Sequence, residues 1–69
     1  MRLSARNVLA GKVIQVTHGV VESEITLELS PGASIVATIT KASAESLGLK
    51  VGTVAHAIIK ASNVIIGVD

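Results

Sequence analysis

Runs of β-branched and small aliphatic residues fill most of this chain, and short turn signals separate them, which favours a fold built mainly of strands. Ile35, Ala37 and Ile39 alternate with other residues in the pattern of a half-buried strand. His18-Gly19 predicts a tight turn in which glycine supplies a positive φ, and Ser30-Pro31-Gly32 predicts a second turn. The predicted strands are residues 8–17, 20–29, 35–40, 54–59 and 64–68.

One short helix is predicted between the third and fourth strands. Thr40 suits the N-cap position and Gly48 suits the position after the last turn, so a helix of barely two turns would lie between them. Its interior would include Ala42, Ala44, Glu45 and Leu47. Five strands with a helix after the third is the element order of an OB-type barrel. No repeat or linker divides the sequence. We therefore expect a single all-β, OB-like domain of five strands over residues 1–69.

The composition indicates that one copy of this chain has a marginal core. At 69 residues the domain is small, and its 49% apolar content includes no Phe, Tyr or Trp. There is no cysteine for a disulfide, and the two histidines are too few for a structural metal. Oligomerisation is the remaining way to enlarge the core, so we expect an oligomer.

The charge and the apolar pattern disfavour nucleic acid and membrane partners. A net charge of +1 provides no basic stripe for duplex DNA, and the absence of aromatic residues removes the usual platforms for stacking single-stranded bases. Met1-Arg2 is not followed by the apolar run of a signal peptide, and no stretch approaches the roughly 20 apolar residues of a membrane span. We expect a cytoplasmic protein.

Three short polar segments combine hydroxyl groups with a positive charge and contain no carboxylate. A fully ionised tetrahedral oxyanion offers only hydrogen-bond acceptors, so such donor segments predict a small-anion site. A structural interpretation also applies, in which Thr40 and Ser43 only cap the helix and Lys41 and Lys60 are solvated charges at strand ends. The three segments are Ser4-Ala5-Arg6-Asn7, Thr40-Lys41-Ala42-Ser43 and Lys60-Ala61-Ser62-Asn63.

The order of these motifs resembles a known family from end to end. The family is that of the molbindins, small molybdate-binding proteins of the Mop type, whose domain also occurs in molybdate transporters and regulators. The motifs that carry the resemblance are Leu3-Ser4-Ala5-Arg6-Asn7, the segment 9–13, Thr40-Lys41-Ala42-Ser43 followed by Leu47-Gly48-Leu49, and the segment 57–62 followed by Val64-Ile65.

The resemblance implies that molybdate or tungstate is held between subunits of a homo-oligomer, a hexamer of OB-like domains. It also implies a second anion site on a symmetry axis, for which Gly19 and Val20 are candidates, although a hairpin turn explains these two residues as well. Neither His18 nor His56 has the neighbours of a catalytic pair. By position, the oxyanion shell would contain Ser4, Ala5, Arg6, Thr40, Lys41, Ser43, Lys60, Ala61 and Ser62.

These observations predict a protein that binds the oxyanion for molybdenum storage, buffering or homeostasis and that catalyses no reaction. The sequence has no Cys, no carboxylate pair among the donor segments and no glycine-rich phosphate loop. Two alternatives stay open, namely an oligomerising interaction module without a ligand and a protein that binds the whole molybdopterin cofactor.

Overall fold

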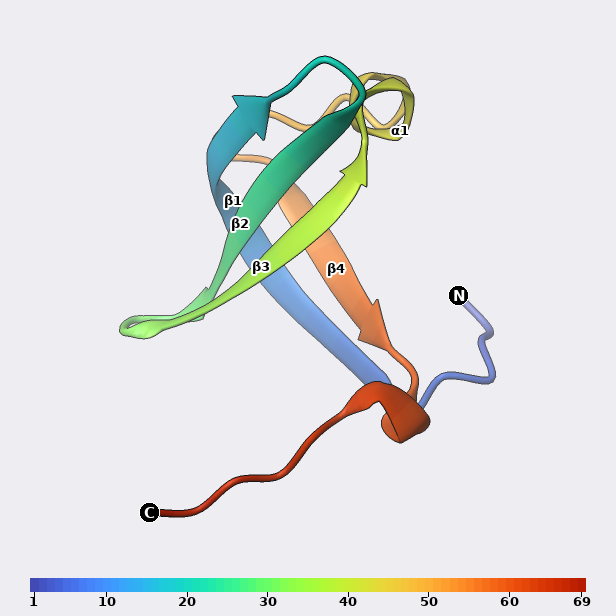
Figure 1. Ribbon diagram of the computed structural model, residues 1–69, viewed down its shortest axis with the longest axis vertical. Helices are drawn as coiled ribbons and strands as arrows, with labels where there is room; N and C mark the ends of the chain where they lie inside the picture. The colour runs from blue at the N-terminus through green and yellow to red at the C-terminus, as the bar shows by residue number, and fades with distance from the viewer.

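A computed structural model describes residues 1–69 and contains one antiparallel sheet with two short helices. The order of the strands in the sheet is β3-β2-β1-β4 (Figure 1). Neither helix is long and apolar enough to span a membrane. The elements are β1 (Asn7–His18), β2 (Glu22–Ser30), β3 (Ala33–Thr40), α1 (Lys41–Ser46), β4 (Val54–Ile59) and the 3-10 helix η1 (Ala61–Asn63).

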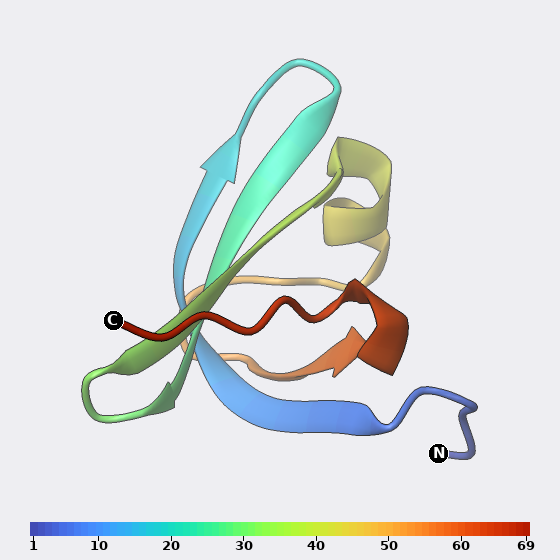
Figure 2. The ribbon, with the colours of Figure 1, turned by 60° about the horizontal axis from the view of Figure 1, so that its bottom comes forward.

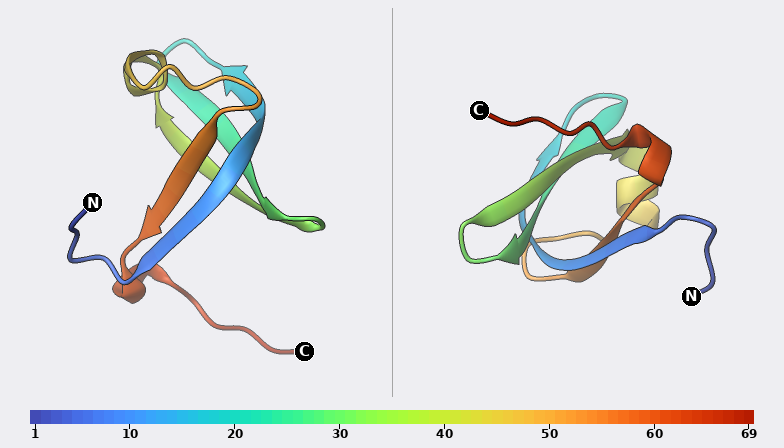
Figure 3. Two further views of the ribbon diagram at one scale, coloured as in Figure 1. Left: turned by 180° about the vertical axis from the view of Figure 1, so that it is seen from behind. Right: turned by 90° about the horizontal axis from the view of Figure 1, so that it is seen from below.

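The long strand β1 belongs to two ribbons. Its first half pairs with β4 from Asn7 to Lys12, and its second half pairs with β2 from Lys12 to His18. The register with β2 shifts between Val13 and Gln15, and such an irregularity bends a strand. The sheet therefore curls into a half-barrel, as the view from below shows (Figure 3).

The half-barrel stays open between its two edge strands. β3 and β4 are not hydrogen-bonded to each other. An apolar groove of about 420 Å³ lies between them, lined from both edges by residues such as Ile39 and Ala57 and from the middle of the sheet by Ile25 and Leu27. The mostly-strand class and a short helix between the third and fourth strands were predicted from the sequence, and the structure agrees with both.

The prediction of a fifth strand was wrong for this chain. Residues 64–68 form no strand, and the segment leaves the sheet beyond η1 (Figure 1). The turn of η1 redirects the chain directly after β4, so the segment has no neighbouring strand to supply its hydrogen bonds. Its side chains are correspondingly exposed, with Ile65 at 93% and Val68 at 95%. We call residues 64–69 the C-terminal arm.

The turn between β1 and β2 also differs from the prediction. Gly19 does not have a positive φ, and β2 begins at Glu22 rather than at residue 20. The Gly19 N–H donates to the carbonyl of Glu22 at 2.7 Å, and a Cβ on Gly19 would lie 2.9 Å from the same oxygen. Glycine is therefore needed here because the backbone approaches closely. At the next turn Gly32 has a φ of +84°, which confirms the predicted turn.

The predicted helix is present and has the predicted ends. Thr40 is the N-cap of α1, where its Oγ1 accepts a hydrogen bond from the N–H of Ser43 at 3.0 Å. Gly48 follows the C-cap with a φ of +64°, which is the left-handed conformation that commonly ends a helix. The helix spans Lys41–Ser46, and Leu47, which was predicted to lie inside it, is its C-cap.

The core of one copy is small. Only five residues are fully buried, and four of them form a single apolar cluster. The fifth is Ser23, whose Oγ lies 2.6 Å from Nδ1 of His18. The buried apolar residues are Val13, Ile25, Leu27 and Ala44, and Ala44 brings α1 against the sheet.

Candidate oxyanion-binding site

Two of the three donor segments meet where β1 begins and β4 ends. Asn7 is the first residue of β1 and pairs with Ile59, the last residue of β4. Arg6 precedes this pair on one strand and Lys60 follows it on the other. The ribbon shows the start of β1 beside η1 in the left view of Figure 3. Sheet pairing therefore places Arg6 and Lys60 on neighbouring strands, directly outside the last pair of the ladder.

One side-chain hydrogen bond links the two strands at this point. Nδ2 of Asn7 donates to the carbonyl oxygen of Ile59 at 3.1 Å. Beyond it, Lys60 to Asn63 form a tight turn in which the Asn63 N–H donates to the Lys60 carbonyl at 2.9 Å. Arg6, Lys60 and Ser62 are exposed, so their donors face solvent.

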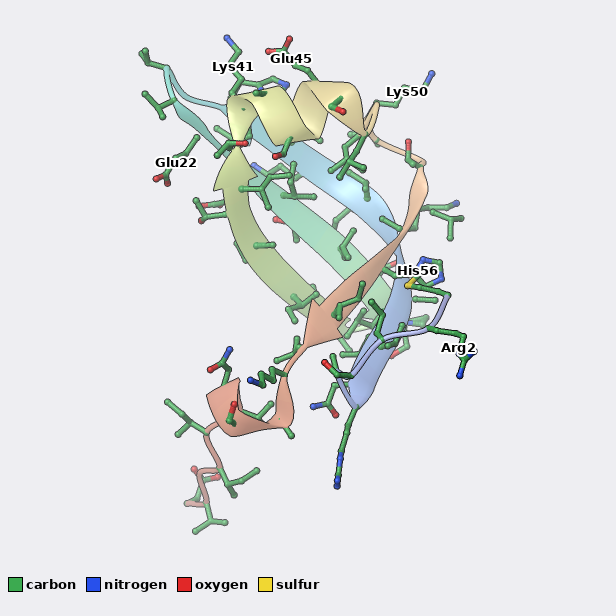
Figure 4. All side chains as sticks on the ribbon, turned by 90° about the vertical axis from the view of Figure 1, so that its right-hand side faces the viewer. Arg2, Glu22, Lys41, Glu45, Lys50 and His56 are labelled. Atoms are coloured by element: carbon green, nitrogen blue, oxygen red, sulfur yellow. The ribbon has the colours of Figure 1, made fainter.

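The third donor segment lies at the opposite end of the molecule. Thr40, Lys41 and Ser43 are at the start of α1, which lies at the other end of the sheet from η1 in Figure 1. Figure 2 shows α1 and η1 on the same side of the molecule. The longest extent of the chain is 34 Å. Figure 4 likewise shows Lys41 at the α1 end of the sheet. One copy of the chain therefore brings Arg6 and Lys60 to one end of the sheet and leaves Thr40, Lys41 and Ser43 at the other.

The hydroxyls at the start of α1 bond to each other. Oγ1 of Thr40 donates to Oγ of Ser43 at 2.7 Å while it accepts from the Ser43 N–H. The hydroxyl proton of Thr40 is thus used within the cap. The hydroxyl proton of Ser43 has no acceptor in the chain, so it can be donated outward.

The three basic side chains of the predicted site are free of hydrogen bonds. The side-chain hydrogen bonds of the chain are those of Asn7, His18 with Ser23, and Thr40 with Ser43. Arg6, Lys41 and Lys60 take part in none of them. Their positive charges are therefore available to a ligand.

The candidates for a second anion site occupy the turn between β1 and β2. The N–H of Gly19 is already bonded to the Glu22 carbonyl, so it cannot also serve an anion without breaking that bond. Val20 is 94% exposed, and its N–H has no partner in the chain. Of the two candidates, Val20 alone offers a free backbone donor.

The two histidines have different surroundings. His18 bonds to the buried Ser23, which ties the end of β1 to the start of β2. His56 lies on β4 (Figure 4). It is among the residues that line the open groove, as is Met1. The two rings lie on different parts of the sheet.

The sequence reasoning missed the role of Asn7. It was noted only as a polar member of the first segment, whereas the structure shows its amide bonding across to β4. An asparagine at the junction of a polar segment and a strand is a signal for such a bond, because its short amide reaches neighbouring backbone groups.

The fold is that of a small OB-like β module with donor groups at both ends. The sequence matches the TOBE domain over residues 3–66. The chain therefore belongs to the TOBE domain (molbindin) family.

Relatives and solved structures agree with this membership. A probable molybdenum-pterin-binding protein of Haemophilus influenzae is 39% identical over 69 residues, which is 100% of both chains. The structure of MopII from Clostridium pasteurianum matches with a TM-score of 0.90 and 40% identity, covering 97% of this chain and 100% of that one. The cytoplasmic molybdate-binding protein ModG, in a form with molybdate bound, matches with a TM-score of 0.95 and 51% identity, covering 100% of this chain and 49% of ModG.

Proposed function

We propose that this protein binds molybdate or tungstate between the subunits of a homo-oligomer and serves as a cytoplasmic store or buffer of the oxyanion, without catalysis. The observation that carries the proposal is the junction of Arg6 and Lys60 beside the Asn7–Ile59 pair. The 51% identity to ModG, which is described as cytoplasmic and as having molybdate bound, supports the choice of ligand and of compartment.

The chemistry of the junction suits a dianion with no proton to donate. The Arg6 guanidinium presents a planar fork of donors, the Lys60 ammonium adds a second charge, and Ser4 and Ser62 add hydroxyls. Ala5 and Ala61 have no polar side chain, so their part in the shell would be played by backbone N–H groups. No carboxylate belongs to these segments, and an anion would therefore meet donors without a fixed acceptor.

The donors at the start of α1 would complete the shell from a second copy. Thr40, Lys41 and Ser43 lie at the other end of the sheet from the junction, so we do not expect them to reach an anion there within one chain (Figure 1). In an assembly, the outward hydroxyl of Ser43 and the free ammonium of Lys41 could face an anion bound at the junction of the neighbouring subunit. Thr40 would act by holding Ser43 through the cap bond.

The apolar surface supports an assembly, which we take to be a hexamer. The C-terminal arm is exposed, and the groove between β3 and β4 is apolar and open. Monomeric proteins seldom leave so much apolar surface in contact with water. Contact between copies would cover it and would also create a symmetry axis, where the free N–H of Val20 could serve the second anion site.

A second candidate is binding of the molybdopterin cofactor, which the name of the Haemophilus influenzae relative favours. A pterin ring needs a stacking surface, and this chain has no aromatic side chain to provide one. We therefore place the bare oxyanion first. An interaction module without any ligand would not need the three donor segments, so anion titration separates it from both.

Competition calorimetry tests the proposal. Molybdate and tungstate should displace one another, sulfate should bind more weakly because it is smaller than the ion that the shell fits, and phosphate should be weaker still because its retained proton finds no acceptor. Phosphate binding as tight as molybdate binding would refute the donor-only site. Binding of molybdopterin without binding of free molybdate would favour the second candidate.

A further inference from the structure

We infer that Asn7 is the positioning residue of the proposed site, because its amide holds the Arg6 segment and the Lys60 segment at a fixed separation. The inference rests on the proposed function, since it assigns the anion to the junction of these two segments. It adds a residue that does not touch the anion and acts by setting the geometry of those that do.

The position of Asn7 in the sheet is the first support. The ladder between β1 and β4 begins with the Asn7–Ile59 pair, and outside that pair both strands have ended. The bond from Nδ2 of Asn7 to the Ile59 carbonyl is 3.1 Å long and partly buried. It is the only side-chain hydrogen bond that joins the two donor segments or the strands that carry them.

The segments on either side have little else to hold them. Residues 1–6 precede the first strand, and none of their side chains forms a hydrogen bond within the chain. The turn after β4 is held by two bonds of its own, from Asn63 N–H to Lys60 at 2.9 Å and from Val64 N–H to Ala61 at 3.2 Å. The last pair of a sheet opens most easily, so loss of the amide bond would weaken the Asn7–Ile59 pair and let the two segments shift relative to each other.

The chemistry of the bond explains why asparagine suits this position. A backbone carbonyl only accepts hydrogen bonds, so its partner must be a donor, and the Asn7 amide is a neutral donor. An aspartate of the same shape would present acceptors to the carbonyl and would add a negative charge next to the anion. The exchange of Asn for Asp therefore removes the bond and opposes binding, whereas the exchange for Ala only removes the bond.

A fixed separation has a consequence for selectivity. Molybdate and sulfate have the same charge and shape but differ in size, so a rigid pair of donor segments can favour the larger ion. If the separation of the two donor segments is free to adjust, the segments can close around sulfate, and the preference for molybdate over sulfate becomes smaller. Asn7 should therefore affect the ratio of the two affinities as well as their magnitude.

The experiment is calorimetric titration of molybdate and sulfate into the wild type, Asn7→Ala, Asn7→Asp and the control Gln15→Ala, with thermal melts in parallel. Gln15 is an exposed amide on the same strand, away from the junction. For Asn7→Ala we expect molybdate affinity to fall about 3- to 10-fold, the loss expected for one hydrogen bond, with a narrower molybdate-to-sulfate ratio and an unchanged number of sites. Asn7→Asp should bind more weakly still, and Gln15→Ala should match the wild type.

Two results would overturn the inference. If the wild type binds molybdate and Asn7→Ala keeps both its affinity and its ratio, the amide does not position the site. If Asn7→Ala loses sites but the remaining sites keep the wild-type affinity and ratio, Asn7 serves folding alone. A wild type that binds no molybdate would refute the proposed function itself, and this inference with it, so the two failures are distinguishable.

Discussion

Arg6 and Lys60 carry the positive charges at the junction of β1 and β4, and neither is engaged by another side chain. We predict that Arg6→Ala and Lys60→Ala each weaken molybdate binding about 10- to 100-fold, because a charge-assisted hydrogen bond contributes roughly 1.5 to 3 kcal/mol. Both side chains are exposed, so the free energy of unfolding should change by no more than about 0.5 kcal/mol. Calorimetry and thermal melts measure the two effects.

Lys50→Ala is the matched control for these charge changes. Lys50 is exposed and lies near α1, at the other end of the sheet from the junction (Figure 4). The Lys50→Ala variant should bind molybdate with the affinity of the wild type. Equal affinity in the Arg6 and Lys60 variants would refute the site and leave the fold assignment intact.

Gly19 gives a prediction about stability. A methyl group on this residue would lie 2.9 Å from the backbone oxygen of Glu22, so the turn between β1 and β2 would have to shift. We expect Gly19→Ala to lower the free energy of unfolding by about 1 to 3 kcal/mol, as overpacking usually does. Gln15→Ala, at an exposed position of β1, is the control. Equal stability of Gly19→Ala and wild type in denaturant unfolding would contradict the steric argument.

Gly19 and Asn7 show what sequence reasoning could reach at the scale of single residues. A turn at Gly19 was predictable, but the reason for glycine was not, since a close backbone approach depends on the path of the next strand. Asn7 was recognisable as polar, yet its partner Ile59 is 52 positions away and becomes a neighbour only through the sheet.

At the scale of elements, α1 was predictable because its signals are local. Thr40 and Gly48 stand at its two ends and act on their own neighbours in sequence. We predict that Thr40→Ala destabilises the protein by about 1 kcal/mol through loss of the cap, while Thr40→Ser retains the stability. Thr38→Ala, on the exposed face of β3, should stay within about 0.5 kcal/mol of the wild type. Thermal unfolding of the three variants provides the comparison, and an unchanged Thr40→Ala would contradict a stabilising cap.

The C-terminal arm shows the limit of local signals. Its residues favour a strand, but a strand needs a neighbour with free hydrogen-bonding groups, and sequence alone does not say where that neighbour is. In one copy of the chain, η1 turns the arm away from both open edges of the sheet.

We predict that removing residues 64–69 lowers the oligomeric state while the sheet survives. The arm is highly exposed and forms no part of the core of its own chain, so its apolar side chains are available to another copy. Sedimentation velocity measures the size, and circular dichroism reports the retained strands. If the truncated protein sediments with the same number of subunits as the full chain, the arm does not join the subunits.

At the scale of the whole molecule, the donors stand at two ends of one elongated chain. The three donor segments could be identified from the sequence, but their places could not. Two of them become neighbours through the pairing of β1 with β4, and the third lies at the far end of the sheet. An anion that uses all three must therefore lie between copies. Anion binding and subunit assembly are then coupled, and molybdate should favour the assembled form by mass action.

Native mass spectrometry tests this account most directly, since it counts subunits and bound anions in the same particle. We predict a closed oligomer, a hexamer, that retains molybdate and loses it when Arg6→Ala or Lys60→Ala is introduced. Monomers released from the oligomer should carry no molybdate. Molybdate bound to a monomer, or an oligomer that takes up none when molybdate is supplied in excess, would contradict it.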